Sequence, residues 1–105
     1  MLICRIYDLD DKEQLALPIT HFSERVSQST NGVESLSCVF RVQSHEANNA
    51  IEQYKKALSV SIGKIVFTAT SDETPVAEYT KYHTVDSIQI DYGVSELTGI
   101  VLFKM

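Results

Sequence analysis

The sequence lacks the features that mark membrane, secreted and nucleic-acid-binding proteins. No apolar run approaches the about 18 residues that a transmembrane helix requires. The first residues have an acidic flank and no long apolar core, so we expect no signal peptide. The nine basic residues are scattered and the net charge is −5, which argues against a nucleic-acid-binding surface. We expect a protein of the cytoplasm or of a virion that has neither a membrane nor a nucleic acid as its partner.

Motifs for catalysis or cofactor binding are also missing. His21, His45 and His83 have no HxxxH or HExxH spacing, and no CxxC pair is present, so a zinc site has no support. The four glycines form neither a P-loop nor a dinucleotide-binding loop. An EF-hand counted from Asp8 would need Gly and Glu at its sixth and twelfth positions, which hold Glu13 and Ile19. We predict a protein that is not an enzyme and that binds no cofactor or metal, with a solvated turn after Asp8.

The two cysteines, Cys4 and Cys38, fall on the apolar faces of predicted strands. This placement predicts two buried free thiols in a reducing compartment. A nucleophilic pair of one cysteine with a histidine stays an alternative, although a reactive thiol requires partial exposure and positive surroundings.

Most of the chain has the alternation of apolar and polar residues that is typical of half-buried strands. A chain of this length fits one domain, residues 1–105. Strands are predicted at residues 2–9, 19–28, 33–43, 61–71 and 76–85, followed by a hairpin over residues 88–105. Pro18 keeps residues 15–18 extended and favours a sheet edge. The predicted fold class is α+β, a mainly antiparallel sandwich or partly open barrel of about six or seven strands, with one helix after the third strand.

Residues 19–43 predict a hairpin. A three-residue loop, residues 30–32, sets Phe22 opposite Phe40 and Val26 opposite Leu36, and it places Gly32 at a left-handed position. The strand over residues 33–43 alternates cleanly, and only Val39 is an apolar residue out of place.

The only predicted helix covers residues 44–59. Ser44 is the expected N-cap, and Glu46 in the first turn suits the helix dipole. The apolar stripe at helical spacing comprises Ala47, Ala50, Ile51, Tyr54 and Leu58.

The final strand, residues 97–105, is apolar on both faces and therefore needs cover on both. A bulge near Asp86 accounts for a change of apolar phase between Val85 and Ile88. The expected pairs are Tyr92 with Leu97, Ile90 with Gly99, and Ile88 with Val101. Ile100 and Leu102 then project from the opposite face, beside Gln89 and Ser87.

Two arrangements of the helix lead to different assembly states. A helix that covers Ile100 and Leu102 allows a monomer. A helix that packs on the core of Phe22, Phe40 and Val42 leaves Ile100 and Leu102 as an exposed apolar patch. Such patches usually mark an interface. We favour the second arrangement and a closed homo-oligomer, in which Ile100, Leu102 and the loop residue Val94 are the candidate interface.

An alternative reading concerns the tyrosines. Tyr79, Tyr82 and Tyr92 are candidate stacking residues if the strand order is that of an oligonucleotide-binding barrel. Such a module also requires a basic groove, which this acidic chain does not offer in its sequence.

Residues 17–23 (LPITHFS) and 31–42 (NGVESLSCVFRV) resemble the early strands of small β-rich tube and hub modules of phage tails. The resemblance implies a small β-sandwich or barrel flanked by one helix and assembled into rings. With no catalytic motif, we predict a non-enzymatic structural or assembly protein that acts through protein–protein contacts, in a phage tail or virion. The alternative function is an OB-like module that binds a ligand or single-stranded nucleic acid.

Overall fold

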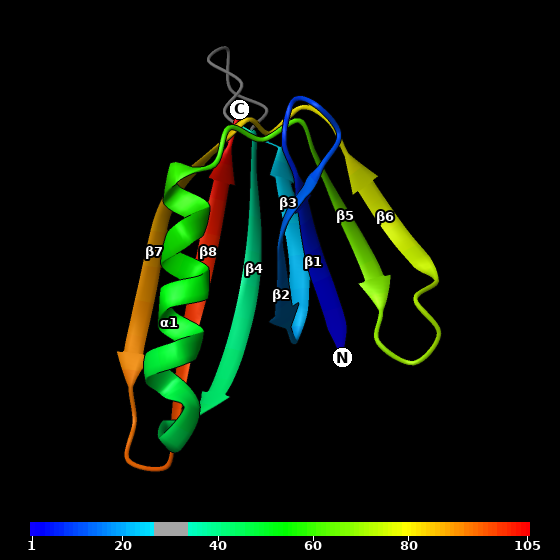
Figure 1. The fold of residues 1–105 in the computed structure, drawn as a ribbon. Helices are drawn as coiled ribbons and strands as arrows, with labels where there is room; N and C mark the ends of the chain where they lie inside the picture. The colour runs from blue at the N-terminus through cyan, green and yellow to red at the C-terminus, as the bar shows by residue number, and fades with distance from the viewer. Residues whose placement is uncertain (27–33) are drawn as a thin grey trace.

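The computed structural model describes residues 1–26 and 34–105. Strands precede and follow one helix in the chain, and this helix lies against the sheet that contains β4, β8 and β7 (Figure 1). In chain order the strands are β1 (Leu2–Tyr7), β2 (Glu13–Ile19), β3 (His21–Val26), β4 (Glu34–Gln43), β5 (Lys64–Ala69), β6 (Pro75–Tyr79), β7 (Thr84–Tyr92) and β8 (Glu96–Lys104). The helix α1 (Ala47–Lys56) follows β4 and is flanked by the short 3-10 turns η1 (Ser44–Glu46) and η2 (Ala57–Ser59).

The strands form two antiparallel four-stranded sheets that pack as a sandwich with one helix. The first sheet has the order β2-β1-β5-β6 and the second has the order β3-β4-β8-β7. The predicted α+β sandwich is therefore confirmed, with eight strands in the described chain instead of six or seven. The helix follows the fourth strand because residues 13–19 form a full strand, β2, which lies at a sheet edge as Pro18 predicts.

The two halves of the chain follow the same path. In each half, two strands enter the first sheet and the next two enter the second sheet, and α1 connects the halves. The halves meet where β1 pairs with β5 and β4 pairs with β8. The sequence contains no internal repeat, so the two halves share a topology but not a similar sequence.

Two segments predicted as single strands are divided between the sheets. Ile19 ends β2 in the first sheet, and His21 begins β3 in the second. The segment 76–85 is likewise divided into β6 and β7, joined by a crossing that contains the buried Tyr82. The single-strand predictions were wrong because period-two alternation continues through a crossing between sheets when both strands contribute to the same core.

The β3–β4 pair has a different register from the one predicted. Phe22 lies opposite Cys38 and Val26 opposite Glu34, a shift of two residues that leaves the faces unchanged. Glu24 consequently lies opposite Leu36 near the sheet end instead of opposite Cys38. In this register the carboxylate of the exposed Glu24 accepts a hydrogen bond from the hydroxyl of the buried Tyr82. The predicted loop, residues 30–32, lies outside the described residues.

The β7–β8 hairpin has the predicted register. Tyr92 pairs with Leu97, Ile90 with Gly99, and Ile88 with Val101. The expected bulge lies between Val85 and Ser87. These pairs follow from local pattern, because one short loop joins the two strands and only one register sets apolar against apolar.

The helical segment is placed correctly, but the N-cap, the place of Glu46 and the burial of Leu58 differ from the prediction. Ser44 does not cap the helix, because its hydroxyl donates to the Val94 carbonyl oxygen at 3.2 Å, and Glu46 takes the N-cap position without a side-chain bond. The last turn tightens into η2, which rotates Leu58 to 53% exposure and buries Ala57 in its place. Ile51 and Tyr54 are buried as expected.

The core lies between the sheets and beneath the helix. Phe22 stacks on Phe67 across the sheets, with ring centroids 3.9 Å apart, and Phe40 stacks on Tyr54 of α1 at the same distance. The Tyr54 hydroxyl donates to the Pro18 carbonyl oxygen at 2.5 Å, so one helical side chain contacts both sheets. The helix and the first sheet together therefore cover the inner face of the second sheet.

Candidate interaction surface

The outer face of the second sheet is the side from which side chains point away from the first sheet and the helix. Leu36, Cys38 and Phe40 of β4 are buried, so their alternating neighbours point outward. The same alternation holds on β3, β7 and β8. We call the resulting surface the outer face. It comprises His21, Ser23, Arg25, Ser35, Ser37, Val39, Arg41, Thr84, Ser87, Gln89, Asp91, Thr98, Ile100, Leu102 and Lys104.

The centre of the outer face is apolar. Ile100 lies opposite Val39 on β4 and opposite Gln89 on β7, and Leu102 lies two residues along the same strand. Ile100 is 38% exposed, and Val39 and Leu102 are half-buried by their strand neighbours. Small hydroxyl side chains surround this centre and leave a shallow groove of about 360 Å³, lined by Ser23, Arg25, Ser35, Ser37, Ser87, Gln89, Ile100 and Leu102.

The position of the helix decides that this face is open. Tyr54 of α1 stacks on Phe40, which points to the opposite side of the sheet from Ile100. Of the two predicted arrangements, the structure has the one in which the helix packs on the core around Phe40. No other element of the described chain covers Ile100 and Leu102. Sequence reasoning found these two residues, whereas it did not assign Val39, whose signal was its break in the alternation of β4.

Two charged residues of the outer face form ion pairs with carboxylates of the same chain, and two others form none among the described residues. Arg41 lies 3.6 Å from Glu96, and Lys104 lies 3.7 Å from Asp86. Arg25 on β3 and Asp91 on β7 are exposed, and neither has an ion-pair partner among the described residues. These two opposite charges occupy opposite corners of the face, at the two edge strands.

Val94 lies apart from the other two candidate interface residues. It is fully exposed at the tip of the β7–β8 hairpin, where Tyr92 is 74% exposed. The tip is beyond the end of the sheet that carries Ile100 and Leu102, and the backbone of Val94 holds Ser44 at the start of η1. The structure therefore joins Ile100 and Leu102 in one surface and places Val94 outside it.

The three candidate stacking tyrosines do not share a surface. Tyr82 is buried, and its ring lies 5.7 Å from the half-buried ring of Tyr79 in an edge-to-face arrangement. Tyr79 in turn meets Phe22 and Phe67 edge-on. Tyr79 and Tyr82 thus contact each other in the core, while Tyr92 is exposed at the tip of the β7–β8 hairpin.

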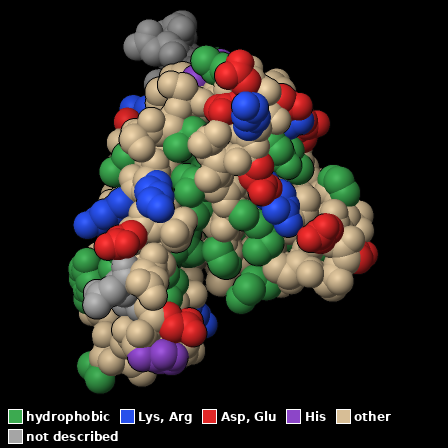
Figure 2. All heavy atoms as spheres, viewed as in Figure 1, with side chains coloured by type: hydrophobic (Ala, Val, Ile, Leu, Met, Phe, Trp, Pro, Cys, Tyr) green, Lys and Arg blue, Asp and Glu red, His purple; other side chains and the backbone are tan. Residues whose placement is uncertain are grey.

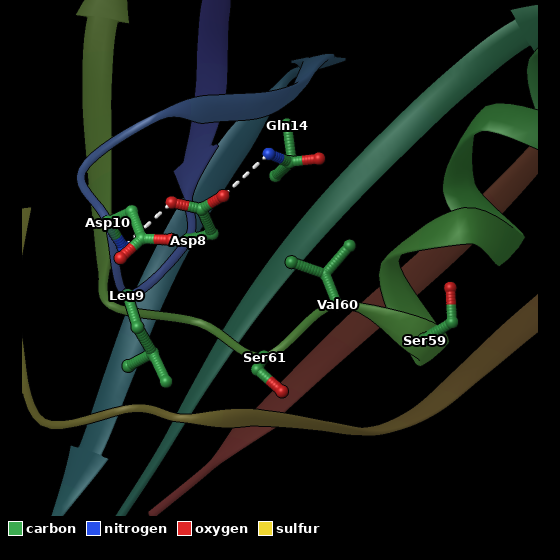
Figure 3. A pocket seen from close by; sticks show the side chains of 7 residues that line it. All are labelled: Asp8, Leu9, Asp10, Gln14, Ser59, Val60 and Ser61. Carbon is green, nitrogen blue, oxygen red and sulfur yellow. Dashed lines mark hydrogen bonds between the residues drawn. The ribbon is translucent and has the colours of Figure 1, made fainter.

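A second hollow lies between the β1–β2 turn and the segment after α1 (Figure 3). It has a volume of about 430 Å³ and is lined by Asp8, Leu9, Asp10, Gln14, Ser59, Val60 and Ser61. The Asp8 carboxylate is engaged in the turn, where it accepts hydrogen bonds from the Asp10 and Lys12 backbone N–H groups at 2.9 Å and from the Gln14 amide at 2.7 Å. These bonds, that from Lys12 first, lower the pKa of Asp8. Asp8 is therefore a turn-forming residue, in agreement with the solvated turn predicted there.

A polar cluster at the crossing between β6 and β7 was not foreseen from the sequence. The Lys81 ammonium contacts the carboxylates of both Glu24 and Glu34. Hydrogen bonds from the Tyr82 hydroxyl and from Lys81 lower the pKa of Glu24, and burial raises the pKa of Tyr82. The four residues come from two strands, β3 and β4, and from the β6–β7 crossing, which are adjacent only in the folded chain, so no local spacing could indicate them. One ammonium group lies between two carboxylates here, an arrangement typical of a structural ion-pair cluster.

No hydrogen bond joins a cysteine to a histidine among the described residues. Cys4 and Cys38 are buried free thiols that lie close together between the sheets, and burial raises the pKa of Cys38. His21, His45 and His83 are exposed. Within residues 1–26 and 34–105, no group of His, Cys, Asp or Glu side chains is arranged to hold a metal ion. No helix in the described ranges combines the length and hydropathy needed to cross a membrane.

Charges of both signs are interspersed over the face shown in Figure 2, without a stripe of one sign. On the outer side of the first sheet, Arg5 pairs with Glu13 at 2.8 Å and Lys64 pairs with Asp11 at 2.9 Å.

No family model matches this sequence, and no curated protein and no solved structure is significantly similar to it. The physical properties of its surfaces therefore carry the functional argument.

Proposed function

We propose that this protein is a non-enzymatic assembly module that acts through protein–protein contacts at the outer face of the second sheet. The observation that carries the proposal is the apolar centre of Val39, Ile100 and Leu102, which the helix leaves uncovered. An apolar centre within a polar, solvent-accessible rim is the usual anatomy of a protein interface. The rim here includes Ser23, Ser35, Ser37 and Ser87, which are small enough to let a partner approach the centre closely.

The free energy available at this face is moderate. Complete burial of an exposed aliphatic side chain is worth about 1.5–3 kcal/mol, and Ile100 is already 62% covered by its own chain, since 38% is exposed. Each of the three side chains can therefore add only a fraction of that value. We expect an association with a dissociation constant in about the micromolar range.

The test is the double substitution Ile100→Asp with Leu102→Lys. It places two charges at the centre of the face while leaving the inner face of β8 unchanged. Light scattering coupled to size exclusion should show a smaller particle than wild type, with a melting temperature within a few degrees. Val76→Asp is the matched control, because Val76 is an aliphatic strand residue of the first sheet with 55% exposure. Loss of folding with no change in assembly would show that Ile100 and Leu102 are ordinary structural residues.

The alternative function, binding of single-stranded nucleic acid, has less support. Stacking proteins require exposed aromatic rings beside a basic groove, and Tyr82 is buried while the chain is acidic. A gel shift with a single-stranded oligonucleotide at low salt tests the order of the two functions, since micromolar, salt-sensitive binding would reverse it. A phage tail or virion is the setting we propose for the assembly module, on the resemblance of residues 17–23 and 31–42.

A further inference from the structure

We infer that the occupant of the outer face is a second copy of this chain, crossed at nearly a right angle and related by a two-fold axis that sets Arg25 of each copy against Asp91 of the other. This inference rests on the proposed function and identifies its partner. It follows from the register of the four strands, from the corner charges that have no ion-pair partner among the described residues, and from the size of the face.

The register defines the face as a grid of outward side chains. From edge to edge, one row runs Arg25, Ser35, Lys104, Thr84, and the next runs Ser23, Ser37, Leu102, Ser87. The third row runs His21, Val39, Ile100, Gln89, and the fourth runs Arg41, Thr98, Asp91. Neighbouring strands are about 4.8 Å apart and outward residues on one strand are about 6.8 Å apart, so Arg25 and Asp91 are at the ends of one diagonal.

A dimer with two identical contact faces has its two-fold axis in the plane of contact. An axis perpendicular to the Arg25–Asp91 diagonal exchanges these corners between the copies. On the spacings of the grid, the strands of the two sheets then cross at about 70–90°, within the orthogonal class of sheet packing. The same rotation brings Leu102 of one copy close to Leu102 of the other and places Ile100 over the small side chain of Ser37.

The charges of the face fit this rotation. Arg25 and Asp91 lack ion-pair partners among the described residues, and the rotation supplies each with the other. Arg41 and Lys104 are neutralised within the chain by Glu96 and Asp86, and the rotation carries both beyond the edge of the opposing sheet. Aligned packing about an axis parallel to the strands would instead set Arg25 against Thr84 and leave both corner charges unpaired.

The size of the face is adequate for a reversible dimer. Four strands span about 19 Å, and two such faces crossed near a right angle overlap over about this width in both directions, which gives a projected overlap of about 360 Å² per copy. Protruding side chains raise the accessible area above this value, and the dimer buries an area below or at the lower end of the about 1,200–2,000 Å² typical of specific interfaces, in the range of weak, transient complexes.

The closing experiment reverses the two charges singly, together and in a mixture, with sedimentation equilibrium as the readout. Arg25→Asp and Asp91→Arg each replace two attractions per dimer by two repulsions, and each should weaken self-association at least about tenfold. An equimolar mixture of the two variants should recover dimers, because the hetero-pair restores both attractions. The double variant should also dimerise about as tightly as wild type.

Arg41→Asp is the control, because Arg41 has its partner in its own chain; it should leave the association within about threefold. A mixture that remains monomeric, or single variants that associate like wild type while Ile100→Asp with Leu102→Lys dissociates, overturns the crossed dimer and leaves the proposed function standing. A wild-type protein that is monomeric at every concentration up to the millimolar range overturns both.

Discussion

Gly99 makes room for the contact that attaches the helix to the second sheet. It lies on the inner face of β8, opposite Phe40 and Ile90. A methyl group at this position would lie 2.2 Å from Cζ of Phe40 and 2.6 Å from the Gln89 carbonyl oxygen. Both distances are far inside van der Waals contact, and one of the two atoms belongs to the backbone of the neighbouring strand. We therefore predict that Gly99→Ala destabilises the fold by displacing the Phe40–Tyr54 stack.

Overpacking of a core costs typically about 1–3 kcal/mol, and the clash with a backbone atom places Gly99→Ala at about the upper end of that range. For a domain of this size, about 3 kcal/mol corresponds to a decrease of about 10–20 °C in melting temperature. Urea unfolding followed by circular dichroism should show a lower midpoint with an unchanged slope. Thr98→Ala is the matched control on the outer face of the same strand, and it should cost less than about 1 kcal/mol.

A second substitution identifies the cause. Phe40→Leu removes the ring atoms nearest to the added methyl group, so it should be less harmful in the Gly99→Ala background than alone. The expected coupling in the double-mutant cycle is about 1 kcal/mol or more. Equal melting temperatures for Gly99→Ala and Thr98→Ala would refute the argument that Gly99 is required for the stack.

Three further predictions concern the interior and its border. The lowered pKa of Glu24 means that its ionised form stabilises the fold above its ordinary pKa of 4.5, and that this contribution is lost as pH falls through the lower folded value. Glu24→Gln should therefore reduce the urea midpoint at about pH 7, and its effect should shrink progressively as the pH falls below 4.5. Tyr54→Phe removes the bond to the Pro18 carbonyl oxygen and should cost about 1 kcal/mol in the free energy of unfolding. The buried thiols of Cys4 and Cys38 should resist iodoacetamide in the native protein. They should react once the protein is unfolded in about 8 M urea. Labelling of the folded protein within minutes would contradict their burial.

The elements that the sequence predicts correctly are those decided by neighbouring residues. The β7–β8 hairpin has its predicted register because one short loop leaves few pairings, and only one of them keeps Ile88 and Ile90 against apolar partners. The helical segment between residues 44 and 59 follows from the spacing of Ile51 and Tyr54. The outward position of Ile100 follows directly from strand alternation.

The details that the sequence predicted wrongly depend on contacts between distant segments. The chain leaves one sheet for the other at Thr20, and no local pattern shows this, because Ile19 and Phe22 enter the same core from different sheets. The β3–β4 register places Glu24 where Tyr82, 58 residues away in the chain, can donate a hydrogen bond to it. Ser44 has the composition of a helix cap, yet its hydroxyl bonds to the distant Val94.

The same division applies to the candidate interaction surface. Alternation along β8 establishes by itself that Ile100 and Leu102 share a face and that this face is opposite to Val101 and Phe103. Whether that face is covered depends on where the helix packs, and an amphipathic helix can pack on either side of a sheet that is apolar on both. The tertiary structure decides this, because the stack of Tyr54 on Phe40 holds the helix on the inner face and leaves the outer face open.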